Sequence, residues 1–431
     1  MTKTLRLLGA GLVTALLVTS CGSSAGSSDD GVELKMVESL TNPARTAVLK
    51  GLIDDFEAAN PGTTVDLISP PTNSADQKIQ QMLQSKKGID VLEVRDTTVG
   101  PFTANGWLRD LSGDLQGWAG WKDMTQQAVD YAQGEDGTWY IPYGFYGLSL
   151  FYRKDLVEKA GFAGPPASWD ELLEQATAIQ DPDAGTYGYA FRGGTNGNGN
   201  LVTAIEAYVA DDLDKTNAFK LTDGRSIFAA PEALTAAQTY FDLFTKAAPP
   251  SSVAWGYPEM VEGFSNGSTA FLLQDPEVIA TVGKSTAIKP DQWATAPLLV
   301  GPTGKAAQPV ATAGWGMAAS TKHAAEATKL IEFLSSGEAS TTFTKENSLV
   351  PILTSAASDP YYSQGPWASY VTMTNAPDTY LSVIQPRNVD WWTEWTQKAD
   401  GDVQRVITGD MTPAELLAGW DQYWTQKWAA E

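Results

Sequence analysis

The chain has few side chains suited to bond-breaking chemistry. It contains one His, His323, and one Cys, Cys21, among 431 residues. A catalytic triad needs a His beside its nucleophile, and most zinc sites need several His or Cys ligands. His323 lies in a segment that has the pattern of an exposed helix start. Neither kind of catalytic site is therefore expected.

Other catalytic and cofactor patterns are weak or absent. The 51 acidic residues could include a carboxylate pair that hydrolyses glycosides, and the sequence neither places nor excludes one. Asp211, Asp212 and Asp214 lack the EF-hand spacing and its closing Glu, which indicates a solvated turn. The glycine-rich run 192–200 lacks both phosphate-binding motifs. We expect a loop there, one that could bring backbone and Asn amides to a ligand, and no metal or cofactor.

Aromatic side chains are frequent, with 15 Trp, 15 Tyr and 14 Phe. Sugars present flat C–H faces that stack on such rings, and hydroxyl groups that pair with planar donors and acceptors. The composition therefore favours binding of a neutral polyol. Among three clustered indoles, Trp392 and Trp395 share a helix face while Trp391 points elsewhere. Trp392 is our stacking candidate, and packing of the whole cluster between domains is the alternative.

The formal net charge of −22 argues against nucleic acid and against a membrane surface held by charge. Lys3 and Arg6 precede the apolar run Leu7–Val18, which is shorter than a membrane span and typical of a signal peptide. We expect a signal at 1–20 and a Gly/Ser-rich tether at 21–31. With one Cys, no disulfide is expected.

The length suggests two domains. Near the N-terminus, strand patterns at 33–38, 63–68 and 89–94 alternate with helical patterns, one of them capped by Asn42. This alternation predicts a parallel, doubly wound sheet. Ligands bind beyond the carboxyl ends of such strands, which places Glu38, Arg95 and Asp96 at a potential site.

Further along, capping boxes begin helices at Ser168/Glu171 and Thr412/Glu415. The last helix carries Trp420, Trp424 and Trp428 at helical spacing, a stripe that we expect in the core. Between these helices we expect a strand at 187–191 and a helix at 231–246.

The segment Tyr140–Ala178 combines an aromatic, Gly-punctuated run, a strand, a short helix, Pro165-Pro166 and the Ser168 helix start. This order resembles the crossover of family 1 extracellular solute-binding proteins, the sugar receptors of ABC importers. Further matches cover essentially the whole of 32–431. They are Gly106–Leu111, Met260–Glu277, Pro309–Ser320 with Ala313 in place of a Gly, Lys322–Ser336 and Leu349–Pro351.

The resemblance implies an α/β, periplasmic-binding-protein-like type II fold, with two doubly wound α/β lobes joined by hinge crossovers. It places the N-terminal lobe at 32–145 and 296–338 and the C-terminal lobe at 146–295 and 339–431. It also implies ligand-facing residues. These are Glu38, Arg95, Asp96 and Trp315 in the first lobe, Tyr146 at the hinge, and Asp275, Glu277, Arg387 and Trp392 in the second.

The same resemblance implies a receptor rather than an enzyme: a monomer that binds a carbohydrate and delivers it to the permease subunits of an ABC transporter. Cys21 resembles the acylated residue of a bacterial lipobox. That implies a lipid anchor on the outer face of a Gram-positive cytoplasmic membrane. A receptor for a polyamine or phosphodiester, and less so a secreted glycan-active enzyme, remain the alternatives.

Overall fold

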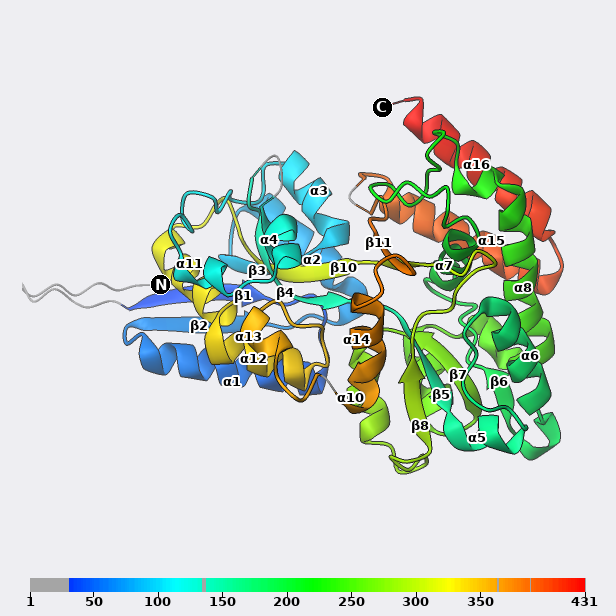
Figure 1. Cartoon of the computed structure of the whole chain (residues 1–431). Helices are drawn as coiled ribbons and strands as arrows, with labels where there is room; N and C mark the ends of the chain where they lie inside the picture. Colours follow the sequence, from blue (N-terminus) through cyan, green and yellow to red (C-terminus); the bar gives the residue numbers. More distant parts are fainter. Residues whose placement is uncertain (1–30, 134–136, 363, 388, 431) are drawn as a thin grey trace, which may run out of the picture.

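The computed structural model describes residues 31–133, 137–362, 364–387 and 389–430. The chain forms two α/β lobes that lie side by side (Figure 1). The expected signal peptide, the tether and Cys21 fall outside the described residues. None of the helices within these ranges has the length and apolar character of a bilayer span.

The first lobe is built on a five-stranded sheet of order β2-β1-β3-β10-β4. Strands β1 (Val32–Val37), β2 (Thr63–Ile68) and β3 (Val91–Arg95) are parallel, as the sequence predicts. Strand β10 (Ala311–Met317) runs antiparallel to both β3 and β4 (Tyr140–Tyr146). The sheet is therefore mixed, because one strand returns from the other lobe in the opposite direction.

Helices cover both faces of this sheet. On one face lie α1 (Pro43–Ala59), α4 (Gln126–Ala132), α11 (Ala324–Leu334), α12 (Gly337–Glu346) and α13 (Thr354–Ala357). On the other lie α2 (Thr72–Ser85) and α3 (Asp96–Ala104). The predicted cap of α1 is present, since the Asn42 side chain accepts the Arg45 N–H at 2.9 Å.

The second lobe contains a four-stranded sheet of order β6-β7-β5-β8. Its strands are β5 (Ser149–Arg153), β6 (Tyr187–Tyr189), β7 (Thr269–Gln274) and β8 (Trp293–Ala296). Only β6 and β7 pair in parallel among these strands. Its helices are α5 (Lys154–Lys159), α6 (Trp169–Ile179), α7 (Asn198–Tyr208), α8 (Pro231–Ala247), α9 (Tyr257–Ser265), α10 (Glu277–Gly283), α14 (Ala368–Thr374), α15 (Trp392–Thr408) and α16 (Pro413–Trp428).

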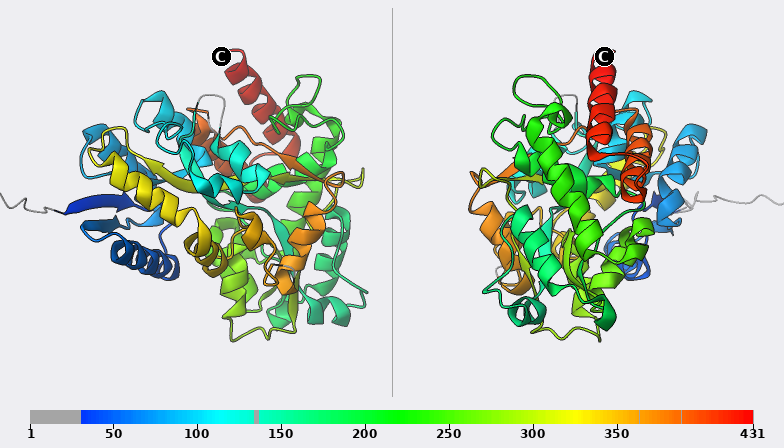
Figure 2. Two further views of the ribbon diagram at one scale, coloured as in Figure 1. Left: turned by 60° about the vertical axis from the view of Figure 1, so that its left-hand side comes forward. Right: turned by 90° about the vertical axis from the view of Figure 1, so that its right-hand side faces the viewer.

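Helices α15 and α16 pack together at the C-terminal end of the second lobe (Figures 1 and 2). The predicted Trp stripe is confirmed as core at Trp420 and Trp424, which are fully buried beside Trp395. Trp428 is only partly buried and packs against Trp424.

The described chain passes between the two cores three times. The first passage joins β4 to β5, and the second precedes β10. The third follows Ala356, the last buried residue of the first core on this segment, and leads to Tyr362 in the second. Beside the passages, β9 (Ala306–Pro309) pairs in parallel with β11 (Tyr380–Val383).

The residues that pack in each core bear on the lobe boundaries expected at 296 and 339. Ala306 and Ala307 pack in the second core, whereas Phe343, Leu349 and Ala356 pack in the first. The sequence motifs mark the segments that cross but carry no information on the lobe against which each segment packs. We therefore propose that both passages lie at higher residue numbers than the motifs suggest.

Candidate functional site

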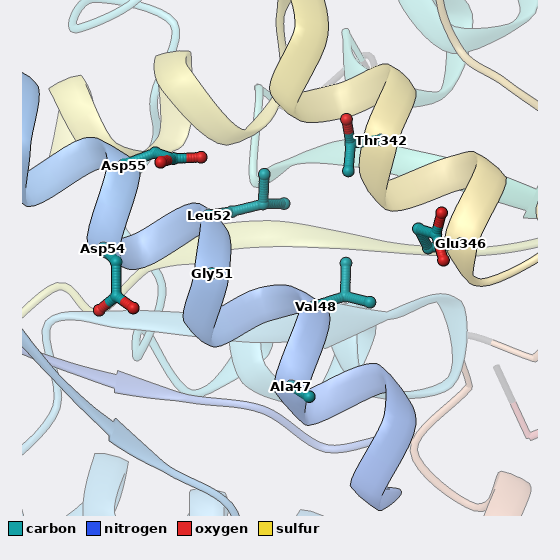
Figure 3. A pocket seen from close by; sticks show the side chains of 8 residues that line it. All are labelled: Ala47, Val48, Gly51, Leu52, Asp54, Asp55, Thr342 and Glu346. Atoms are coloured by element: carbon teal, nitrogen blue, oxygen red, sulfur yellow. The ribbon is translucent and has the colours of Figure 1, made fainter.

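A surface hollow of about 490 Å³ lies between α1 and α12 of the first lobe. It contains none of the residues that the sequence analysis selects. The carboxylates of Asp54, Asp55 and Glu346 point in different directions around it (Figure 3). This hollow has no converging polar groups, so the candidate site lies instead where the two lobes meet.

On the first-lobe side, a buried guanidinium joins two carboxylates. Arg45 donates from Nη1 to Glu38 at 3.0 Å and from Nη2 to Glu93 at 2.8 Å, and all three side chains are fully buried. Thr46 donates to the other Glu38 oxygen at 2.6 Å. Glu38, predicted to face a ligand, therefore uses both oxygens inside the lobe and fixes the turn after β1.

Glu93 is the most heavily bonded member of this network. It accepts hydrogen bonds from the Tyr143 hydroxyl at 2.5 Å and from the backbone N–H groups of Ser39 and Leu40. Burial alone would raise the pKa of Glu93, but Arg45 and these donors hold it below its usual value. The carboxylate therefore stays charged and ties the turn after β1 to the middle of β3 and β4.

Tyr146 extends this network toward the second lobe. Its hydroxyl lies 3.0 Å from that of Tyr143, at the end of β4 where the chain leaves the first lobe. Burial raises the pKa of Tyr146 well above its usual range, and the nearby charge of Glu277 adds to the effect. Tyr146 is thus a neutral hydroxyl within the electrostatic reach of a carboxyl group on the other lobe.

Asp275 and Glu277 form the corresponding edge of the second lobe. They follow β7, and Asp275 accepts the Glu277 N–H at 3.1 Å. Both keep part of their surface exposed, yet desolvation raises the pKa of each carboxyl group above its usual value, and the charge of Asp275 raises that of Glu277 further. Among the described residues, neither has a basic side chain within 4.0 Å. A protonated Glu277 can both donate to and accept from a hydroxyl group.

One ion pair joins the lobes directly. Arg387, which follows β11, places Nη1 3.4 Å from the Asp96 carboxylate at the start of α3. The two side chains are 26% and 20% exposed, so each remains reachable from solvent. Burial raises the pKa of Asp96, and Arg387 and Arg95 oppose that rise. The structure thus brings together two predicted residues that lie 291 positions apart in sequence.

The remaining predicted residues have their main contacts within their own lobes. Arg95 pairs with Asp76 of α2, within the first lobe. Trp315 is fully buried, with its ring centroid 5.0 Å from that of Tyr143 and 5.5 Å from that of Phe343, and offers no surface at the lobe junction.

Trp392 packs its ring 5.9 Å from Phe219 and 6.4 Å from Trp424 but remains partly exposed. His323 is the partly exposed N-cap of α11, as expected from the sequence.

Several residues of the junction escaped the sequence analysis. Two of them carried a usable signal. Glu93 is the only charge within Val91–Val94. Glu206, which is fully buried and accepts a hydrogen bond from Gln385, two residues before Arg387, is the only charge in the apolar helix α7. A single carboxylate in an apolar element must find a buried partner or change its pKa. Arg45 and Tyr143 gave no such signal, because their roles depend on packing between distant strands.

The pairing of two α/β lobes through three passages, with polar groups gathered where the lobes meet, is the architecture of a two-lobed solute receptor with the type II periplasmic-binding-protein fold. A profile of bacterial extracellular solute-binding proteins matches residues 41–341. The chain belongs to this family.

Individual relatives and solved structures match most of the chain. A putative binding protein of Brucella abortus is 24% identical over 416 residues, which cover 95% of each chain. The maltose-bound MalE3 of T. maritima superimposes with a TM-score of 0.77 at 22% identity, over 91% of this chain and 99% of that one. The protein Lmo0181 of Listeria monocytogenes, in complex with cycloalternan, reaches 0.78 at 20% identity, over 93% and 100%. The expected type II fold is confirmed.

Proposed function

We propose that this protein is the substrate receptor of an ABC transporter, and that it captures a carbohydrate between its lobes and delivers it to the permease subunits. The observation that carries the proposal is the junction itself. Asp96 and Arg387 meet across it, and the partly exposed Asp275 and Glu277 at the edge of the second lobe have no basic side chain within 4.0 Å among the described residues. Such groups suit hydroxyl recognition, since each can donate or accept a hydrogen bond according to its protonation.

The relatives support a sugar or polyol over other solutes. Structures similar to this chain contain maltose, cycloalternan and D-mannitol. A mannitol-binding protein of Pseudomonas aeruginosa is 25% identical over 221 residues, half of this chain. Trp392 supplies a partly exposed indole face for stacking on a sugar ring.

We also propose that the mature protein is a monomer anchored through a diacylglycerol on Cys21 to the outer face of a Gram-positive cytoplasmic membrane. The signal-like segment ahead of Cys21 and the extracellular character of the family support this placement. A lipoprotein of Streptomyces antibioticus is 22% identical over 440 residues. Two acyl chains give stable anchoring, whereas one gives only marginal binding.

A receptor for a polyamine is the second candidate. Asp275 and Glu277 are two adjacent carboxyl groups without a basic partner among the described residues, and an ammonium group would favour their charged forms. A glycan-active enzyme is a third candidate, which consumption of the ligand would reveal.

A thermal-shift screen of the full chain carrying Cys21→Ser tests these readings with mono- and oligosaccharides, amines and phosphodiesters. A ligand that binds only the folded state stabilises it by about 2.7 kcal/mol at 100 times its Kd. We expect a shift with one class of sugar. We expect Trp392→Ala to weaken the binding of that sugar about tenfold or more, because a stacked ring is lost.

Trp428→Ala is the matched control, since Trp428 is also partly buried against Trp424 but lies at the end of α16. It should leave sugar affinity unchanged. A shift with amines or phosphodiesters alone would overturn the sugar proposal and keep the receptor. Hydrolysis of the stabilising oligosaccharide would favour the enzyme.

A further inference from the structure

Glu206 is a fully buried carboxyl group in the apolar helix α7 of the second lobe. One oxygen accepts a hydrogen bond from the Gln385 amide at 2.7 Å. The other is buried without a hydrogen-bond partner among the described residues. Burial of a carboxyl group with one bond is costly, so the contact with Gln385 calls for a structural or functional reason.

Gln385 in turn holds the side chain of Arg387. Its amide oxygen accepts two hydrogen bonds from the guanidinium, from Nε at 2.9 Å and from Nη2 at 2.6 Å. Two hydrogen bonds that converge on one oxygen restrict the orientation of the guanidinium as well as its position. The nitrogen left over, Nη1, is the one that faces Asp96 across the lobe junction.

The backbone on both sides holds this geometry. Ile384 accepts the Ala218 N–H at 2.8 Å and donates to the Lys215 carbonyl at 2.9 Å, which ties the segment after β11 to the second lobe. On the first lobe, one Asp96 oxygen accepts the Thr97 N–H at 2.9 Å, and the other is directed at Arg387. Each partner is thus oriented by its own lobe.

We propose that Gln385, anchored on Glu206, is a positioning residue that holds Arg387 against Asp96 and thereby sets the strength of a latch between the lobes. The latch favours the arrangement in which the lobes approach, and a solute bound between them gains affinity from it. The gain in affinity rests on the proposed function, whereas the latch itself does not. Without Gln385, the long Arg387 side chain regains its rotamers and spends less time opposite Asp96.

The test measures interlobe distances by pulsed electron paramagnetic resonance in the full chain without added solute. Cys21→Ser removes the only native cysteine, and spin labels are attached at Lys78→Cys on α2 and Gln238→Cys on α8, both exposed. We expect Gln385→Ala and Asp96→Asn each to lower the ratio of short to long distances by about two- to fivefold, in line with a partly exposed ion pair.

The decisive comparison is the double variant. If Gln385 acts through Arg387 and Asp96, Gln385→Ala adds no further change in the Asp96→Asn background. Equal effects in both backgrounds would show a merely structural role and overturn the proposal, as would unchanged distances in the single variants. Gln404→Ala, at an exposed position on α15 of the same lobe, is the control and should change nothing.

A second variant keeps the test valid if Gln385→Ala folds poorly. Arg387→Lys keeps the positive charge but lacks the planar fork through which Nε and Nη2 both donate to the Gln385 oxygen. It should therefore lose the short distances to a similar extent. Unchanged short distances in Arg387→Lys would overturn the proposal that the two hydrogen bonds to Gln385 position residue 387. If the distances behave as expected while no sugar binds, the latch stands and the proposed function falls.

Discussion

Protonation of Glu206 also affects the stability of the fold. Burial raises its pKa from 4.5 to about 8. Between these values the folded protein retains a proton that the unfolded chain has released, so stability falls as the pH rises through this window, by at most about 1.4 kcal/mol per pH unit. Glu206→Gln keeps an acceptor for Gln385 and removes the titration.

We therefore expect Glu206→Gln to be about as stable as the wild type at pH 5 and about 1–3 kcal/mol more stable at pH 9. Urea unfolding at several pH values measures this difference. Glu232→Gln, at an exposed position of α8, should show no such trend. A difference that does not depend on pH would mean that Glu206 gains or loses no proton in this range.

The sequence located about half of the candidate site. Strand ends and motif order identified Asp96, Asp275, Glu277 and Arg387, because the carboxyl ends of strands and the loops after them are set by local pattern. They could not tell that Trp315 points inward. Trp315 lies within β10, and the direction of a side chain on a strand depends on the register with neighbouring strands, which come from distant parts of the chain.

At the scale of elements, Gly314 is a single position on which the pairing of β10 with β4 depends. The pairing of β10 with β4 shifts register between Ala313 and Gly314. A Cβ at Gly314 would lie 2.0 Å from the Ile141 carbonyl oxygen, which is backbone and cannot move aside. We expect Gly314→Ala to cost about 2–3 kcal/mol of unfolding free energy through overpacking.

Gly51 is the matched control in an exposed stretch of α1, where a Cβ would meet nothing within 4 Å. Gly51→Ala should stabilise the protein by about 0.5–1 kcal/mol, since Ala is the better helix former. Chemical denaturation of both variants checks the pair. Similar free energies for the two would contradict the close approach of β10 and β4.

Local pattern predicted most elements but not how all of them pair. Strand β2 has its expected bounds, and α6 starts at the Ser168 cap, whose hydroxyl accepts the Glu171 N–H at 3.2 Å. The antiparallel direction of β10 was not predictable, because alternation of apolar residues is the same in either direction. It follows instead from the passage of the chain between lobes.

At the scale of the whole molecule, the lobes are joined by passages that also contact one another. Gln308 of β9 faces the backbone of Leu148, in the first passage. With its amide oriented to suit both groups, it donates to the Leu148 carbonyl at 3.2 Å and accepts the Leu148 N–H at 2.5 Å. The same strand β9 pairs with β11, which leads to the latch residue Arg387. One side chain thus couples two of the passages on which any movement of the lobes depends.

Gln308→Ala should uncouple these passages while leaving both cores intact. We expect a broader distribution of interlobe distances and a loss of about 0.5–1.5 kcal/mol in unfolding free energy, the contribution of an ordinary hydrogen bond. Pulsed electron paramagnetic resonance with the Lys78 and Gln238 label positions measures the width, and Gln404→Ala serves again as the control. Only the fraction of molecules in the closed arrangement binds the solute tightly. A broader ensemble lowers that fraction, so Gln308→Ala should also weaken binding of the sugar identified by thermal shift. An unchanged width of the distance distribution would mean that other contacts in the passages restrict the movement of the lobes. Weaker sugar binding without a broader distribution would indicate that Gln308 contacts the solute itself.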